Sequence, residues 1–186
     1  MAPKTDLPTL ARKLWLPMLL MGLGAVVGGV VAGVVQATLD DPLEFAQVGA
    51  WKPGLVFLGI GLLLSAITLL LVRILGELLA GGRRLQVSLG EEALMITPPW
   101  TRRVFPVAMM MGLATLIFTF AFGFVQAAKL DTDPAGAADI GAWLAPLRFA
   151  GPALIFTAIA FALLTIVKVL RFQADRITQI VERRRG

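Results

Sequence analysis

Long apolar stretches without any ionisable side chain dominate the pattern along the chain. Each is bounded on both sides by a charged residue, and together they cover residues 14–39, 53–72, 104–128 and 149–167. About 20 apolar residues rising ~1.5 Å each span the ~30 Å hydrocarbon core of a bilayer. The pattern predicts an all-α integral membrane protein with four transmembrane helices, at about residues 14–39, 53–75, 104–128 and 149–172.

The segments between these stretches predict the orientation of the chain in the membrane. Fourteen of the 17 Lys and Arg residues lie before residue 14, within residues 73–103 or after residue 167. Because cytoplasmic loops are enriched in Lys and Arg, both termini are expected in the cytoplasm. The Arg-rich, Asn-free composition is typical of a GC-rich bacterial genome, so we expect a multi-pass protein of a bacterial plasma (inner) membrane.

Two similar halves follow each other along the chain. Residues 21–37 match residues 111–127 at a constant offset of 90, with seven of 17 positions identical. Coincidence within a small apolar alphabet is the alternative to duplication. Each half has two helices, so both halves enter the membrane from the same side as a parallel, tandem repeat. We divide the chain into a first repeat (residues 1–86), a cytoplasmic connector (residues 87–101) and a second repeat (residues 102–186).

The cytoplasmic segments contain two further patterns. Leu85–Leu89 alternates apolar and polar residues and can pair with residues 93–97, which predicts a small β-hairpin between the second and third helices. The last helix ends in the basic cluster Arg183, Arg184 and Arg185. These arginines either hold anionic lipid headgroups or are a solvated topology signal.

The residues available for chemistry exclude most catalytic classes. The chain has no His, Cys or Tyr, so a disulfide scaffold, a Cys/His metal site and His-dependent catalysis are excluded. We expect no enzyme, no cofactor, no metal site and no nucleic-acid partner, because the charges do not form one soluble basic face. Soft thioether ligands suit Cu(I), but without Cys or His the methionines near the cytoplasmic helix ends are more simply apolar filling. They are Met18, Met21, Met109, Met110 and Met111.

Two glutamines are the polar candidates inside the helices. Gln36 and Gln126 lie at matching depths near the outer ends of the first and third helices. Either they face each other across the repeat axis and line a path, or they make ordinary interhelical hydrogen bonds.

Small residues give the first helix a groove. Glycines at small-xxx-small spacing allow close helix packing, and the set is Gly24, Gly28, Gly29 and Gly33. At offset 90, Phe118 and Phe122 stand where the first helix has Gly28 and Ala32. We predict that these phenylalanines lie in or beside the groove at Gly28, Gly29 and Ala32; the alternative is that they face lipid or a partner.

Two functions fit these features. The first is a non-enzymatic accessory or scaffold subunit, embedded in the lipid bilayer and packed against another membrane protein or a second copy. The second is a channel or carrier for an apolar or weakly polar solute, formed by the bundle or its oligomer. The four charge-free stretches argue against a proton-coupled pump, which needs ionisable groups inside the membrane.

Overall fold

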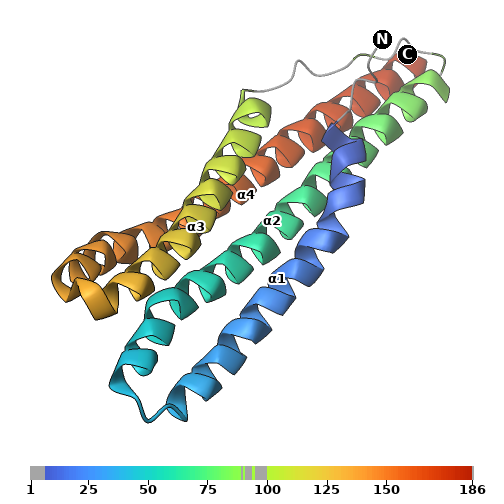
Figure 1. The fold of residues 1–186 in the computed structure, drawn as a ribbon. Coiled ribbons are helices and arrows are strands. Elements are labelled where there is room, and N and C mark those ends of the chain that lie inside the picture. The colour runs from blue at the N-terminus through green and yellow to red at the C-terminus, as the bar shows by residue number, and fades with distance from the viewer. Residues whose placement is uncertain (1–6, 89, 91–93, 95–99, 186) are drawn as a thin grey trace, which may run out of the picture.

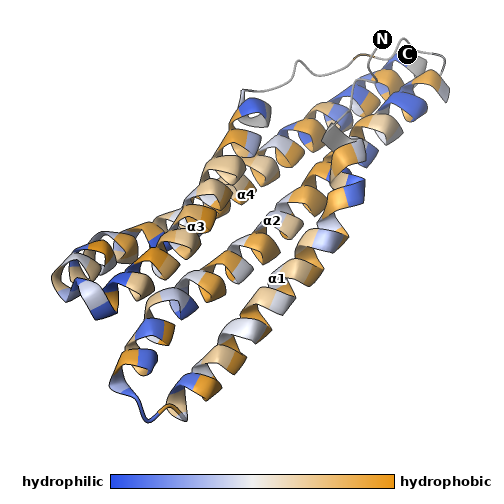
Figure 2. Ribbon diagram, in the orientation of Figure 1, coloured by the Kyte–Doolittle hydropathy of each residue, from blue (hydrophilic) through white to orange (hydrophobic). Residues whose placement is uncertain are grey.

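Four long helices make up the regular structure of the described residues. The computed structural model describes residues 7–88, 90, 94 and 100–185. Helix α1 spans Leu7–Ala37, α2 Pro42–Ser88, α3 Thr101–Thr132 and α4 Pro134–Arg185. All four are long and apolar enough to cross a membrane, which confirms the predicted all-helical fold with four candidate spans. Apolar residues dominate the middle of the helices, and hydrophilic ones gather near their ends (Figure 2).

The helices form two antiparallel hairpins joined through α2. Helix α1 packs against α2 and α3 packs against α4, while α2 also contacts both α3 and α4. The turns that join α1 to α2 and α3 to α4 define what we call the hairpin end of the bundle (Figure 1). The start of α1 and the end of α4 lie at the opposite end, the terminal end, towards which α2 and α4 run in parallel.

The same dipeptide, Asp-Pro, stands at the start of both α2 and α4. Asp41 and Asp133 each precede the proline that is the first residue of α2 or α4. The Asp41 carboxylate accepts a backbone N–H two residues on (2.8 Å), and the Asp133 carboxylate accepts one three residues on (2.9 Å). Asp at the N-cap bonds an otherwise unpaired N–H, and Pro at the first helical position has none to satisfy. Both dipeptides therefore fix where a helix starts.

Glycines bring the two helices of each hairpin into backbone contact. A Cβ added at Gly22 would lie 3.0 Å from the carbonyl oxygen of Gly59, and one added at Gly112 would lie 2.7 Å from that of Gly151. Side chains larger than hydrogen do not fit at such distances. In a membrane the close contact itself holds helices together, because lipid is as apolar as Leu.

Helices α2 and α3 also approach closely, which joins the two hairpins. A Cβ at Gly54 would lie 3.0 Å from the Cα of Phe120, and one at Gly123 would lie 2.9 Å from the Cα of Trp51. The Trp51 ring stacks on that of Phe124, with ring centroids 5.5 Å apart. Helix α2 thus contacts the other three helices and occupies the centre of the bundle.

Nearer the terminal end, all four helices contribute to one buried cluster. Its members are Ala11, Leu69, Val72, Phe105, Ala108, Ala158 and Ala162. Further towards the middle, Leu116 of α3 is fully buried, and added Cβ atoms at both Gly61 and Gly151 would collide with it. Side chains therefore fill the centre of the bundle.

The predicted β-hairpin is wrong in its first strand. Leu85–Ser88 complete α2 as helix, so the predicted repeat boundary at residue 86 falls inside that helix; residue 89 and most of residues 93–97 lie outside the described part of the chain. The chain does return to α2 at Leu94, whose N–H and C=O bond the Gln86 amide at 2.7 and 3.3 Å. Extending an existing helix adds one hydrogen bond per residue, whereas an isolated two-stranded hairpin is marginal in water.

Two glycines of α1 provide a matched test of the close crossing. Gly22→Ala places a methyl against α2 and should lower the free energy of unfolding by about 1–3 kcal/mol, the usual cost of overpacking. Gly24→Ala should be neutral or slightly stabilising, because a Cβ there meets nothing within 4 Å and Ala favours the helix. Denaturant titration in detergent, followed by circular dichroism, compares the two. Equal stability would contradict the crossing.

The start of α4 should respond to pH. The Gly136 N–H and, less strongly, Lys129 lower the pKa of the Asp133 carboxyl. A lowered pKa adds stability above the unfolded-state pKa that is lost as pH falls through the folded-state value. The protection factor of the Gly136 amide, which is its intrinsic exchange rate at each pH divided by the observed rate, should therefore fall on acidification. In Asp133→Asn, which keeps an acceptor but does not titrate, this acid-dependent loss of protection should be absent.

Candidate functional site

The candidate polar residues gather in the half of the bundle nearest the hairpin end. Gln36 is buried on α1, where its Nε2 donates to the carbonyl oxygen of Phe45 (2.8 Å) and its Oε1 accepts from the Lys52 ammonium (2.5 Å). The Lys52 side chain also passes 3.7 Å from the position of a Cβ at Gly33. The Gln36 amide thus links α1 to α2 through both its nitrogen and its oxygen. Such interhelical hydrogen bonds are the ordinary role of a glutamine in a membrane helix.

Gln126 occupies the equivalent place in the second hairpin. A Cβ at Gly141 of α4 would lie 2.6 Å from its Nε2, as a Cβ at Gly49 of α2 would lie 3.0 Å from the Nε2 of Gln36. The Gln126 Oε1 is buried with no hydrogen-bond partner among the described residues. Helices α1 and α3 make no close backbone approach in the described part of the chain, so each glutamine serves its own hairpin. The two amides do not face each other.

The glycine groove of α1 is filled by α2. A Cβ at Gly29 would overlap the Val56 side chain, and one at Gly28 would meet Leu55 at 3.7 Å. Gly24 has open space around it and takes no part in this contact. The groove is therefore an internal contact of the first hairpin, apart from its Gly24 end.

Phe118 and Phe122 lie elsewhere, so the contact we predicted between them and the groove is not made. Their rings lie 4.3 Å apart and contact Trp143 of α4, with centroids at 5.7 and 5.3 Å. The prediction failed because α2 stands between α1 and the second hairpin and supplies the branched side chains that occupy the groove.

Two cations inside the helices are residues that the sequence analysis missed. Lys52 is 10 residues beyond the start of α2 and Arg148 is 14 beyond the start of α4, or ~15 and ~21 Å along the axes. The Arg148 Nη2 donates to the carbonyl oxygen of Ala50 on α2 (2.8 Å). Both residues directly precede a charge-free stretch, so the pattern predicts them outside the helices. The apolar residues before each of them indicate that the helix begins earlier.

The third cation of the hairpin end behaves differently. Lys129 is exposed and forms an ion pair with Asp133 at 3.2 Å, within the turn itself. Within the residues that the structure describes, neither Lys52 nor Arg148 has a carboxylate at ion-pair distance. Their acceptors in that part of the chain are uncharged oxygens.

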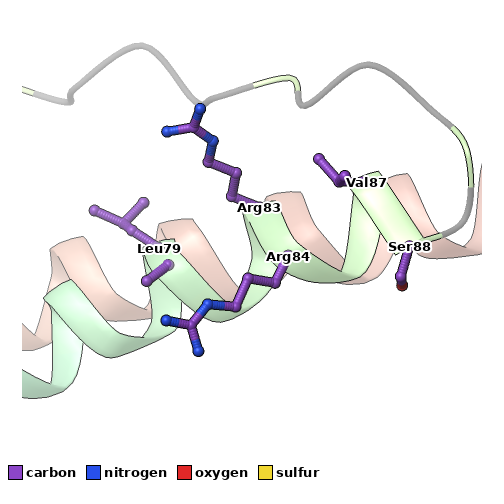
Figure 3. A pocket seen from close by; sticks show the side chains of 6 residues that line it. Leu79, Arg83, Arg84, Val87 and Ser88 are labelled. Carbon is purple, nitrogen blue, oxygen red and sulfur yellow. The ribbon is translucent and has the colours of Figure 1, made fainter.

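The terminal end offers an open basic surface. A hollow of about 600 Å³ lies along the last turns of α2, lined by Leu79, Ala80, Arg83, Arg84, Val87 and Ser88. The Arg83 and Arg84 side chains leave the helix in different directions and do not converge on one point (Figure 3). Arg183 is exposed at the end of α4, and the side chains of Arg184 and Arg185 lie outside the described part. The side chains of Arg83 and Arg84 are thus placed where water can solvate their charges.

The methionines do not converge on one point either. Met18 and Met109 pack against the buried cluster near the terminal end, whereas Met21, Met110 and Met111 are exposed. Among the described residues, no three or more acidic side chains are placed to hold a metal ion. Met18 and Met109 thus fill space beside the cluster, as Met commonly does, and the other three methionines lie on the surface.

Comparisons with known proteins indicate no family for this chain. No family model, no curated protein and no solved structure matches the chain. Its function must therefore be inferred from the residues and contacts themselves.

The Gln36–Lys52 contact can be measured by a double-mutant cycle. Gln36→Leu removes the acceptor of a half-buried ammonium and should lower the free energy of unfolding by about 1–3 kcal/mol. Lys52→Met should cost less on its own, because it leaves no buried charge. The double variant should be more stable than the sum of the single losses predicts, with a coupling of about 0.5–3 kcal/mol. Additive losses, measured in detergent, would show that the contact contributes nothing.

Proposed function

We propose that the chain is a non-enzymatic accessory or scaffold subunit of a membrane complex. In this proposal it is a multi-pass protein of the plasma membrane with both termini in the cytoplasm. The observation that supports it best is the position of α1, whose backbone, in the described part of the chain, comes close to α2 and to no other helix. In the most apolar stretch of α1, 11% of the residues are buried, against 33–39% in the other three helices.

The uncovered side of α1 has the form of a helix-packing face. We define the α1 outer face as Leu20, Gly24, Val27, Val31 and Val34, which repeat at alternating spacings of four and three residues. The three valines are 56–64% exposed, and Gly24 leaves a notch between Leu20 and Val27. Stiff β-branched side chains beside a notch suit close packing with another helix, which in lipid depends on shape.

We also infer that the chain arose by tandem duplication. The Asp-Pro helix starts recur at an offset of 92, as do Gly59 and Gly151, while their partners Gly22 and Gly112 recur at 90. Equivalent residues thus make equivalent contacts in both hairpins. In this proposal α3 of the second hairpin packs against both α2 and α4, whereas α1 of the first hairpin keeps one side uncovered for a partner.

A channel or carrier through one bundle has less support. Leu116 fills the centre, and the buried Thr68 and Thr119 bond carbonyls of their own helices, at 3.0 Å each. Gln36 is already bonded to Lys52 and Phe45. A path would need to form between copies of the chain.

Site-specific photocrosslinking in native membranes tests the proposal. A photoreactive residue at Val27 or Val31 should give one stoichiometric adduct with a foreign membrane protein, because these positions would contact the partner. The same residue at Ile117, which is equally exposed on α3 (57%), is the matched control and should give none.

A homo-oligomer that transports solute would contradict the proposal. If the chain purifies in mild detergent as a homo-oligomer alone and supports solute flux in liposomes, the accessory function is wrong. The channel function would then replace it.

A further inference from the structure

We propose that Arg148 binds the phosphate of an anionic phospholipid on the surface of the bundle near the hairpin end. Its guanidinium extends from α4 to α2, where Nη2 donates to the carbonyl oxygen of Ala50 at 2.8 Å. Its Nε is enclosed with no partner among the described residues. The α4 sequence around it is apolar, with Ala145, Pro146 and Leu147 before it and a charge-free stretch from Phe149 onward.

The protein does not compensate this charge. The structure pairs Lys129 with Asp133 in the turn, but it places no carboxylate at ion-pair distance from Arg148 in the described residues. A guanidinium has five N–H donors, and one of them is bonded here. A charge among apolar helices is costly unless an anion meets it, and a carbonyl dipole lacks the full opposite charge.

The geometry of the guanidinium suits a phosphate. The planar fork of Arg bonds two phosphate oxygens at once, which the point charge of Lys cannot do. Arg148 is only half-buried, and its neighbours Ala145, Pro146 and Phe149 on α4 are exposed. Because Nε is enclosed, a phosphate would be bonded through the terminal Nη groups of the guanidinium.

The neighbouring aromatic pair argues for a lipid as the source of that phosphate. Phe149 is 67% exposed and meets Phe57 of α2 edge to face, with centroids 5.1 Å apart. Phe57 lies seven residues beyond Ala50 along α2, or ~10 Å further from the hairpin end. The cation thus lies nearer the hairpin end and the apolar rings lie deeper, in the order of a headgroup and its acyl chain. A free phosphate would use only the cation.

Lys52 supplies the matched control. It carries the same charge at the same end of the bundle, but its ammonium faces α1 and bonds Gln36. Loss of either residue changes the net charge equally, so a difference between the two variants reports a site and not bulk electrostatics.

Native mass spectrometry of the full chain in detergent measures the binding. The protein is titrated with phosphatidylglycerol, phosphatidylcholine or inorganic phosphate. The wild type should retain one phosphatidylglycerol more tightly than phosphatidylcholine. Arg148→Gln should weaken that affinity about 10- to 100-fold, as expected for hydrogen bonds to a charged group. Arg148→Lys should be intermediate, and Lys52→Gln should bind as the wild type does.

Phe149→Ala separates the two possible sources of phosphate. It should weaken phosphatidylglycerol binding and leave any inorganic phosphate binding unchanged, and as a change at an exposed position it should fold even if Arg148→Gln does not. Helical content by circular dichroism checks each variant. Equal lipid binding by Arg148→Gln and Lys52→Gln would overturn the proposal. So would lipid binding that Phe149→Ala leaves unchanged, since the site would then recognise phosphate alone.

Discussion

Backbone-to-backbone approach at glycine is the constraint on which the rest of this structure depends. Lipid offers no hydrophobic drive between helices, so their association rests on shape and close contact. Gly22 meets Gly59 in the first hairpin and Gly112 meets Gly151 in the second, while Gly54 and Gly123 let α2 touch α3. With these crossings in place, α2 has three neighbours and α1 has one.

The hydrophobic pattern was sufficient to predict the number and class of elements. Twenty apolar residues without charge have few alternatives to a membrane helix, because every backbone polar group must be satisfied within the segment. The same pattern could not predict helix length. Helices α2 and α4 continue past the charges that end their apolar stretches, since a charged residue on a helix surface does not stop the helix. For that reason the apolar pattern predicts Lys52 and Arg148 outside the helices. The alternation of apolar and polar residues predicts a strand at Leu85–Ser88, although these residues complete α2.

The partners of individual side chains could not be predicted, because they depend on which helix is central. Trp51 and Trp143 occupy equivalent positions, yet Trp51 stacks on Phe124 of the other hairpin while Trp143 meets Phe118 within its own. The two tryptophans are 92 residues apart, as the Asp-Pro helix starts are. Only the contact of α2 with α3 makes them different, and it also explains why the groove of α1 meets Val56 and not a phenylalanine.

The differences between the halves follow from the same asymmetry. Helix α3 has Phe118 and Thr119 where α1 has Gly28 and Gly29. Thr119 is buried, whereas Phe118 is 43% exposed and its ring contacts Trp143 of the same hairpin. A helix held by one neighbour depends on the closeness of that contact, so in α1 small residues lie against α2 and branched apolar residues point away from it. The small residues of α1 thus match its contact with α2 alone among the described helices. In the proposed duplication, the glycine crossings are kept in both hairpins, because they hold each hairpin together, while the side chains around them differ with the neighbours of each helix.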